Sequence, residues 1–197
     1  MRFRVFGTEI YISFLFAALI ALMLATDRTG MALPAIFAVF MHEMGHLFCM
    51  WVTDCAPKAV RLIPASVQIR TSIGVSYKRD IAVAICGPAV NFILFGILYF
   101  NYAAYSNKTV LYYSLLNLII GLFNMLPVKG LDGGTILYSL LAKRMEISRV
   151  CIIMRIVTLA LALIILSIAI IMSVKGKLNL SVYIISIYLF VTAIMKM

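Results

Sequence analysis

The sequence predicts an all-α polytopic membrane protein with about six transmembrane helices and a small β-hairpin-like element between the second and third helices. Of its 197 residues, 64% are apolar or aromatic and 12% are charged, whereas soluble domains average about 45–50% and roughly 25%. Apolar runs long enough to cross a bilayer recur along the chain. This composition excludes a disordered chain, a disulfide-rich secreted domain and an ordinary soluble enzyme.

Uncharged runs locate five of the predicted spans, at 10–26, 81–107, 109–128, 156–174 and 178–195. Each reaches the roughly 17 residues that a spanning helix needs. A further run, 29–53, is long enough but contains His42, Glu43 and His46. We predict a single membrane domain over 1–197, with its core motifs in 33–145 and helices five and six at about 150–196. A soluble regulatory domain is not expected.

Two segments are not typical of plain spans. Between 59 and 77, β-branched and polar residues alternate around Pro64 and Gly74, which predicts short strands. After the fourth span, Pro127 and Gly130 oppose continuation of the helix. We expect a short second helix at about 133–144.

The basic residues predict the orientation of the chain. The net charge is +10, but no Lys/Arg-rich run suggests nucleic acid as a partner. With six spans, one side of the membrane receives 12 of the 17 basic residues and the other receives four, while Arg155 lies at the start of span five. Because cytoplasmic loops carry the excess of Lys and Arg, both termini are predicted to be cytoplasmic.

The run from His42 to His46 reads His-Glu-Met-Gly-His and fits the pattern H-E-x-x-H. Residues four apart share a helix face, so both imidazoles can reach one zinc ion, and Glu43 is placed to take a proton from water. All three ionisable groups fall inside a predicted span, where burial without a partner is costly. The alternative is a polar contact between helices without chemistry.

A catalytic zinc usually has three protein ligands. The chain has no third histidine, so an Asp, Glu or Cys must complete the set. Asp132 stands out because it follows the broken fourth span, and non-helical backbone at membrane depth is tolerated where it lines protein or a wet cavity. An N-cap role at the start of the short helix is an alternative that is compatible with ligation.

These motifs resemble the site-2 protease family of intramembrane zinc metalloproteases. The similarity rests on His42–His46, on the pattern N-x-x-P-x-x-x-x-D-G-G from Asn124 to Gly134, and on a G-P-x-x-N element from Gly87 to Asn91. It covers roughly residues 5–145. The run Arg-Leu-Ile-Pro at 61–64 and the compact turn at 126–134 look most like the branch that contains the stage IV sporulation protein FB.

The resemblance implies Zn²⁺ held by His42, His46 and Asp132, with Glu43 as the catalytic base. It also implies that Asn124 faces the active site and helps to bind substrate or stabilise an oxyanion. The implied reaction is hydrolysis of a peptide bond in or near the membrane segment of a protein, such as a membrane-bound sigma-factor precursor. That sporulation protein carries a nucleotide-sensing CBS domain after its last span, which this sequence does not show.

The expected partners are a membrane-tethered protein substrate, inhibitory or presenting membrane proteins and the lipid bilayer, but not nucleic acid. The expected location is a bacterial-type plasma membrane or forespore membrane. The segment 59–77 either pairs with an extended substrate or covers the membrane face as a structural hairpin. Competing functions are a non-hydrolytic transporter or metal-binding scaffold, or the same protease acting on anti-sigma factors or signal-peptide remnants.

Overall fold

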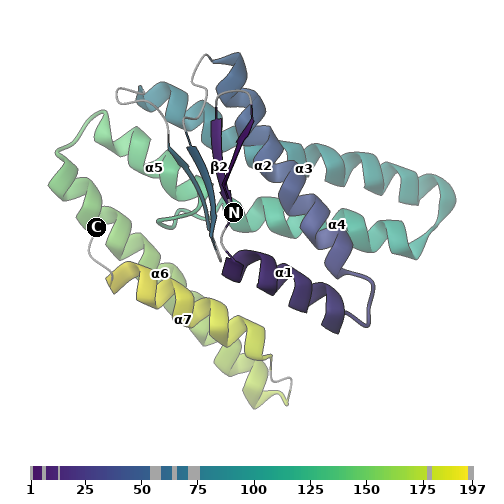
Figure 1. Cartoon of the computed structure of the whole chain (residues 1–197). Helices are drawn as coiled ribbons and strands as arrows, with labels where there is room; N and C mark the ends of the chain where they lie inside the picture. Colours follow the sequence, from purple (N-terminus) through teal and green to yellow (C-terminus); the bar gives the residue numbers. More distant parts are fainter. Residues whose placement is uncertain are drawn as a thin grey trace. The chain divides into compact units, whose positions relative to one another are not determined.

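The chain divides into two compact units, residues 1–124 and 125–197. A computed structural model describes residues 2–5, 8–12, 14–53, 59–63, 66–70, 76–176 and 179–194. The first unit contains, in order, β1 (Arg2–Val5), β2 (Thr8–Ile12), α1 (Phe14–Thr26), α2 (Ala32–Val52), β3 (Ala59–Ile63), β4 (Ser66–Arg70), α3 (Tyr77–Tyr105) and α4 (Lys108–Asn124) (Figure 1). The second contains α5 (Asp132–Ala142), α6 (Ile147–Val174) and α7 (Leu180–Ile194).

The four strands form one sheet in the order β1-β2-β3-β4. β1 and β2 are antiparallel, β2 and β3 are parallel with Ile10 opposite Val60, and β3 and β4 are antiparallel with Val60 opposite Ile69. β2 precedes α1 and β3 follows α2, so their pairing holds the start of α1 near the end of α2. Within the first unit, the N-terminal strands and the 59–70 strands therefore lie at the same end of the α1–α2 helix pair.

The N-terminal strands correct the sequence prediction. Residues 10–12 were expected to begin the first span, but they belong to β2. The run from Thr8 to Ile12 is rich in β-branched and aromatic residues, and it forms backbone hydrogen bonds with a segment about 50 residues later. Local hydropathy does not detect such a pairing, because the partner is distant in sequence.

The 59–77 segment, where strands were expected, contains β3 and β4, and Tyr77 already begins α3. Pro64, Gly74 and the other residues of 64–65 and 71–75 lie outside the described residues.

Three helices, α2, α3 and α6, are long and apolar enough to cross a membrane. α1, α4 and α7 have 13, 17 and 15 residues, and at 1.5 Å per residue they are shorter than a hydrocarbon core of about 30 Å. Two predicted ends were also wrong. α4 ends at Asn124 instead of reaching 128, and α6 begins at Ile147, nine residues before the predicted start at 156. The short helix expected at 133–144 is α5.

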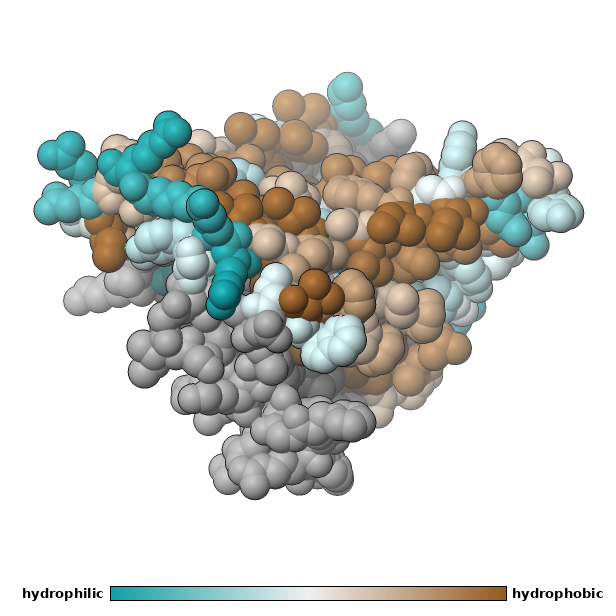
Figure 2. Space-filling model, turned by 90° about the horizontal axis from the view of Figure 1, so that it is seen from above, coloured by the Kyte–Doolittle hydropathy of each residue, from teal (hydrophilic) through white to brown (hydrophobic). Residues whose placement is uncertain are grey.

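The outward surfaces of the long helices are strongly apolar. Trp51 on α2 and Phe100 on α3 are 72% and 77% exposed, and brown apolar residues cover much of the face drawn in Figure 2. A soluble protein rarely exposes continuous apolar surface on this scale. Together with the three long apolar helices, this surface indicates an integral membrane protein.

α2 and α3 approach closely because small residues face each other. A Cβ added at Gly45 on α2 would lie 2.6 Å from the carbonyl oxygen of Cys86 and 2.9 Å from Val90 on α3. In lipid, such small-residue contacts replace the hydrophobic driving force that holds helices together in water. This close approach brings the buried face of α2, which carries both histidines, against α3.

The second unit has its own apolar core. Val128, Ala162 and Leu189 are buried together, with partly buried leucines and isoleucines around them. The hydroxyl of Ser186 on α7 donates to the carbonyl of Ala162 on α6 at 3.3 Å. These contacts join the chain before α5 to the α6–α7 pair.

Candidate metal centre

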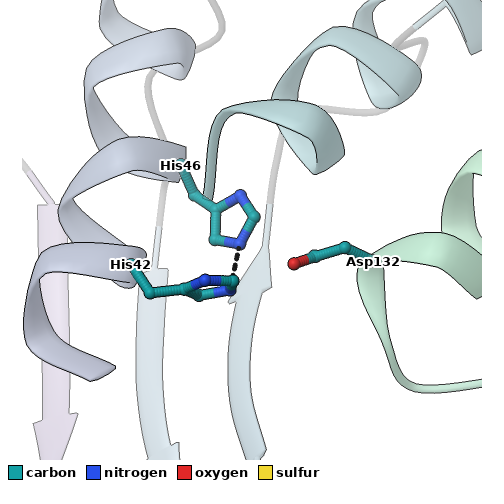
Figure 3. A group of neighbouring side chains, drawn as sticks. All are labelled: His42, His46 and Asp132. Atoms are coloured by element: carbon teal, nitrogen blue, oxygen red, sulfur yellow. Dashed lines mark hydrogen bonds between the residues drawn. The ribbon is translucent and has the colours of Figure 1, made fainter. Parts of the chain in front are cut away.

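His42 and His46 lie one turn apart on the buried face of α2. They are 4% and 7% exposed, and their rings meet edge to face with centroids 4.7 Å apart. Their Nε2 atoms are 3.1 Å apart, as the dashed line in Figure 3 shows. The spacing of four residues therefore places one nitrogen of each ring at a common point, as the sequence predicts.

The other nitrogen of each ring is committed to a fixed acceptor. His46 Nδ1 lies 2.8 Å from the carbonyl oxygen of Val83 on α3. A carbonyl oxygen can only accept, so this Nδ1 carries the proton and Nε2 has a lone pair. His42 Nδ1 lies 2.7 Å from the side-chain oxygen of Asn91.

The orientation of the Asn91 amide is set by a backbone group. Asn91 is fully buried, and its Nδ2 donates to the carbonyl oxygen of Ala38 on α2 at 3.1 Å. Because Ala38 O can only accept, Nδ2 must face it and Oδ1 must face His42. His42 therefore also carries its proton on Nδ1 and presents an Nε2 lone pair.

Two lone pairs facing each other at 3.1 Å repel unless a cation or a proton lies between them. Two nitrogens on a tetrahedral zinc, each at about 2.0–2.1 Å, are separated by roughly 3.3 Å. Metal-bound histidines almost always donate their second ring N–H to a carbonyl or carboxylate, which fixes ring orientation and raises ligand basicity. The donor set of the pair thus fits a zinc ion.

Gly87 on α3 leaves the space in which the two rings sit. A Cβ at this position would lie 2.4 Å from both Cε1 and Nε2 of His46 and 2.8 Å from Nε2 of His42. The next residue, Pro88, is also buried and has no N–H. The G-P-x-x-N element therefore provides space through Gly87 and an oriented acceptor through Asn91.

Asp132, also drawn in Figure 3, is the first residue of α5 in the second unit. The N-cap position is Leu131, so the alternative interpretation of Asp132 as the N-cap residue is wrong. A carboxylate in the first turn is favoured by the free amides of the helix, and its Oδ2 atom is buried.

Two glycines bring the preceding turn against the first turn of α5. A Cβ at Gly133 would lie 2.0 Å from the carbonyl oxygen of Met125, and one at Gly134 would lie 1.9 Å from that of Val128. Backbone atoms cannot move aside as a flexible side chain does, so only glycine fits here. The Gly-Gly pair thereby fixes the position of Asp132 relative to the 125–129 turn.

Glu43 follows His42 on α2 and is half-buried. Asn124 is the last residue of α4, is half-buried, and donates through Nδ2 to Ile120 of its own helix at 3.0 Å. One of its N–H groups is thus used within its own helix. The structure assigns neither residue a chemical role by itself.

The four-residue spacing placed both histidines on one face of α2, but the contribution of α3 to their surroundings was not predicted. Val83 contributes through its backbone, which has no sequence signature, and Gly87 contributes by lacking a side chain. Asn91 both joins the helices and orients a histidine, since it bonds to Ala38 on α2 and to His42.

Comparison with known proteins relates this chain to metalloproteases. A model of peptidase family M50 matches residues 101–166, which include Asn124 and Asp132 but not His42 or His46. A zinc metalloprotease of Methanocaldococcus jannaschii is 25% identical in an alignment 155 residues long, which covers 72% of this chain and 45% of that protein. The chain thus matches less than half the length of this curated relative.

The fold is also similar to a solved structure. A site-2 protease from Methanocaldococcus jannaschii aligns with a TM-score of 0.69, covering 98% of this chain and 93% of that one at 23% identity. At this identity the likeness concerns the fold. The match to the M50 model and the zinc metalloprotease relative support a relation to the M50, or site-2 protease, family, and the solved site-2 protease shows the same fold.

Proposed function

We propose that this chain is an intramembrane zinc metalloprotease of the site-2 protease family. The observation that carries the proposal is the pair of Nε2 lone pairs of His42 and His46, held 3.1 Å apart by acceptors on both Nδ1 atoms. A polar contact between helices would not need two lone pairs aimed at one point. The alignments to metalloproteases support the same reading.

His42, His46 and Asp132 are the proposed zinc ligands. They offer two imidazole nitrogens and one carboxylate oxygen, a donor set typical of a catalytic zinc that keeps one position open. Asp132 is supported by its place at the helix start after the Asn124–Gly134 motif and by the glycines that fix this turn.

A bound zinc ion supplies Lewis acidity, which lowers the pKa of water and polarises a carbonyl. Glu43, next to His42 on the same helix, accepts the proton of the attacking water and delivers it to the leaving amine. Asn124 donates a hydrogen bond to the developing oxyanion through the N–H that Ile120 does not use.

The proposed substrate is a membrane-tethered protein cleaved in or near its membrane segment, and membrane-bound sigma-factor precursors, as for the sporulation branch of the family, are the first class to test. His46 lies six residues before the end of α2 at Val52, which is about 9 Å along the helix, so the site lies in the cytoplasmic half of the bilayer if both termini are cytoplasmic. Among the strands that the structure describes, β4 is at an edge of the sheet, where an extended substrate could pair with it.

The first experiment replaces the proposed catalytic base, Glu43, and leaves the proposed zinc ligands unchanged. Glu43→Gln should retain zinc and abolish cleavage of a co-expressed tethered substrate, with a loss of at least about 100-fold, whereas His46→Ala should lose both zinc and cleavage. Glu146→Gln, which changes an exposed acid at the start of α6, is the matched control and should behave as wild type. Cleavage by Glu43→Gln at the wild-type rate would contradict the assignment.

A further inference from the structure

Asn117 on α4 takes part in the hydrogen-bond chain that ends at His42. Its side-chain oxygen accepts from Asn91 Nδ2 at 3.1 Å, and its own Nδ2 donates to the carbonyl oxygen of Tyr113 at 2.9 Å. Both asparagines are buried, with exposed fractions of 0% for Asn91 and 6% for Asn117. Nothing in the sequence motifs singles out Asn117.

The orientation of Asn117 is determined by the backbone. Tyr113 O can only accept, so the Asn117 amide must direct Nδ2 toward it and Oδ1 toward Asn91. Asn91 Nδ2 consequently has two acceptors, Ala38 O and Asn117 Oδ1. A flipped Asn91 amide would face both of them with an oxygen and would lose two hydrogen bonds at once.

The orientation of the Asn91 side-chain amide determines the tautomer of His42. When Oδ1 of Asn91 faces His42, the ring must carry its proton on Nδ1, and Nε2 is unprotonated. With the amide flipped, Nδ2 would face Nδ1, the proton would move to Nε2, and the ring could not bind a metal through that atom. The acceptor on Asn117 therefore disfavours a tautomer that cannot bind metal.

We propose that Asn117 is a positioning residue that holds His42, through Asn91, in the tautomer that presents Nε2 to a metal. The chain of bonds runs from Tyr113 through Asn117 and Asn91 to His42 and links α4, α3 and α2. The inference deepens the proposed function, because it takes the metal centre as given. The tautomer itself, however, is a property of the metal-free protein.

The test uses the fact that the chain has only two histidines. Full-length metal-free protein, labelled with ¹⁵N-histidine in detergent micelles, should give one set of ring signals for each, with Nδ1 protonated in both. Asn117→Leu, which keeps the branching at Cγ but removes the acceptor, should shift His42 toward the Nε2-protonated form. His46, held by Val83 O, should not change, and it reports that the variant is folded.

Two further variants separate positioning from packing. Ser114→Ala removes another buried α4–α3 hydrogen bond, from Ser114 Oγ to Phe95 O at 3.0 Å, and should leave the His42 tautomer unchanged. Asn117→Asp keeps an acceptor oxygen toward Asn91 and should restore the wild-type tautomer. A shift of His42 in Ser114→Ala equal to that in Asn117→Leu, or no rescue by Asn117→Asp, would overturn the proposal.

Zinc titration of the same samples distinguishes this inference from the proposed function. Asn117→Leu should bind Zn²⁺ about tenfold more weakly than wild type, as expected for a residue that orients a ligand. If wild type does not bind Zn²⁺, the proposed function fails while the tautomer result stands. If wild type binds Zn²⁺ and Asn117→Leu changes neither the tautomer nor the affinity, the positioning role is wrong.

Discussion

Gly87 lies opposite the two histidines, and its missing side chain leaves the space that their rings occupy at the proposed metal site. The ring nitrogens that face each other also face the Cα of this residue, at a distance that leaves no space for a methyl group. Close-packed interiors transmit such an overlap directly to their neighbours. The glycine therefore belongs to the site as much as the residues that carry donor atoms.

Gly87→Ala should displace His46 and weaken Zn²⁺ binding by at least about tenfold, as is typical when the groups that orient a metal ligand are disturbed, although both histidines remain. The reason is the 2.4 Å separation between the added Cβ and Nε2 of His46. Zinc content after purification and Zn²⁺ titration of the metal-free protein measure the effect.

Gly96→Ala provides the control in the same helix, because a Cβ at Gly96 has no neighbour within 4 Å. Replacing a glycine inside a helix by alanine adds up to about 1 kcal/mol of helix propensity, so this variant should bind zinc as wild type does and unfold no earlier. Equal zinc loss in both variants would show that α3 tolerates no added methyl, and the specific role of Gly87 would be wrong.

At the scale of elements, the turn before α5 depends on Gly133 and Gly134. The carbonyl oxygens of Met125 and Val128 lie where the Cβ atoms of larger residues would be. Gly130, at φ +92°, adds a left-handed residue to the same turn. The second unit thereby begins with a tightly specified turn that leads into Asp132.

Gly134→Ala should destabilise the second unit by about 1–3 kcal/mol, since the overlap is with backbone and the turn must shift. Thermal unfolding of the detergent-solubilised protein should show a lower transition temperature, and proteolysis within 125–131 should be faster. Thr135→Ala, at an exposed position one residue later, should change neither measurement. A wild-type transition in Gly134→Ala would contradict the close packing of this turn.

The turn between α1 and α2 is organised by Asp27. One carboxylate oxygen accepts from the N–H and hydroxyl of Thr29 at 2.8 and 2.7 Å, and the other accepts from the N–H of Ala32 at 2.8 Å. The bond from the Thr29 hydroxyl, followed by those from the two amides, lowers the pKa of Asp27 below its usual value. The folded turn therefore prefers the ionised carboxylate.

The sign of the pH effect follows from this lowered pKa. The stabilisation is fully present above the unfolded-state pKa of about 3.9 and is lost as pH falls through the lower folded-state value. Amide exchange protection at Thr29 and Ala32 should accordingly decrease in acid. In Asp27→Asn, protection at these two amides should be weaker at neutral pH and nearly independent of pH; a wild-type acid profile in this variant would exclude Asp27 as the titrating group.

The sequence predicted the helices, because apolar runs and residue spacing are properties of neighbouring residues in one segment. The apolar runs located the long helices, and the four-residue spacing in α2 placed both histidines on one buried face. β1 and β2 were missed because β2 pairs with β3 across about 50 residues, and its apolar residues merge with the apolar run of α1. Asn117 and Val83 were missed because their roles depend on how α3 and α4 pack beside α2, which one sequence does not encode as a pattern.

At the scale of the whole molecule, charge distribution complements the apolar surface. Lys108 and Lys175 are exposed at helix ends on one predicted side of the membrane, whereas Lys143, Arg144 and Arg149 are exposed around the α5–α6 connection on the other. The pairing of β2 with β3 places the N-terminal strands and the 59–70 strands at one end of the α1–α2 pair. That the two termini lie on one side of the membrane stays a prediction from the distribution of Lys and Arg.

Cysteine labelling tests this topology. In a variant with the four native cysteines replaced, Asn107→Cys, between α3 and α4, should react with a membrane-impermeant maleimide in intact cells. Ser148→Cys, at the exposed start of α6, should react only after permeabilisation, because the excess of Lys and Arg keeps this connection in the cytoplasm. Labelling of both after permeabilisation is the accessibility control. Reaction of Ser148→Cys in intact cells, with Asn107→Cys protected, would invert the orientation and place the metal centre in the outer half of the bilayer, where a substrate tethered on the cytoplasmic side could not reach it.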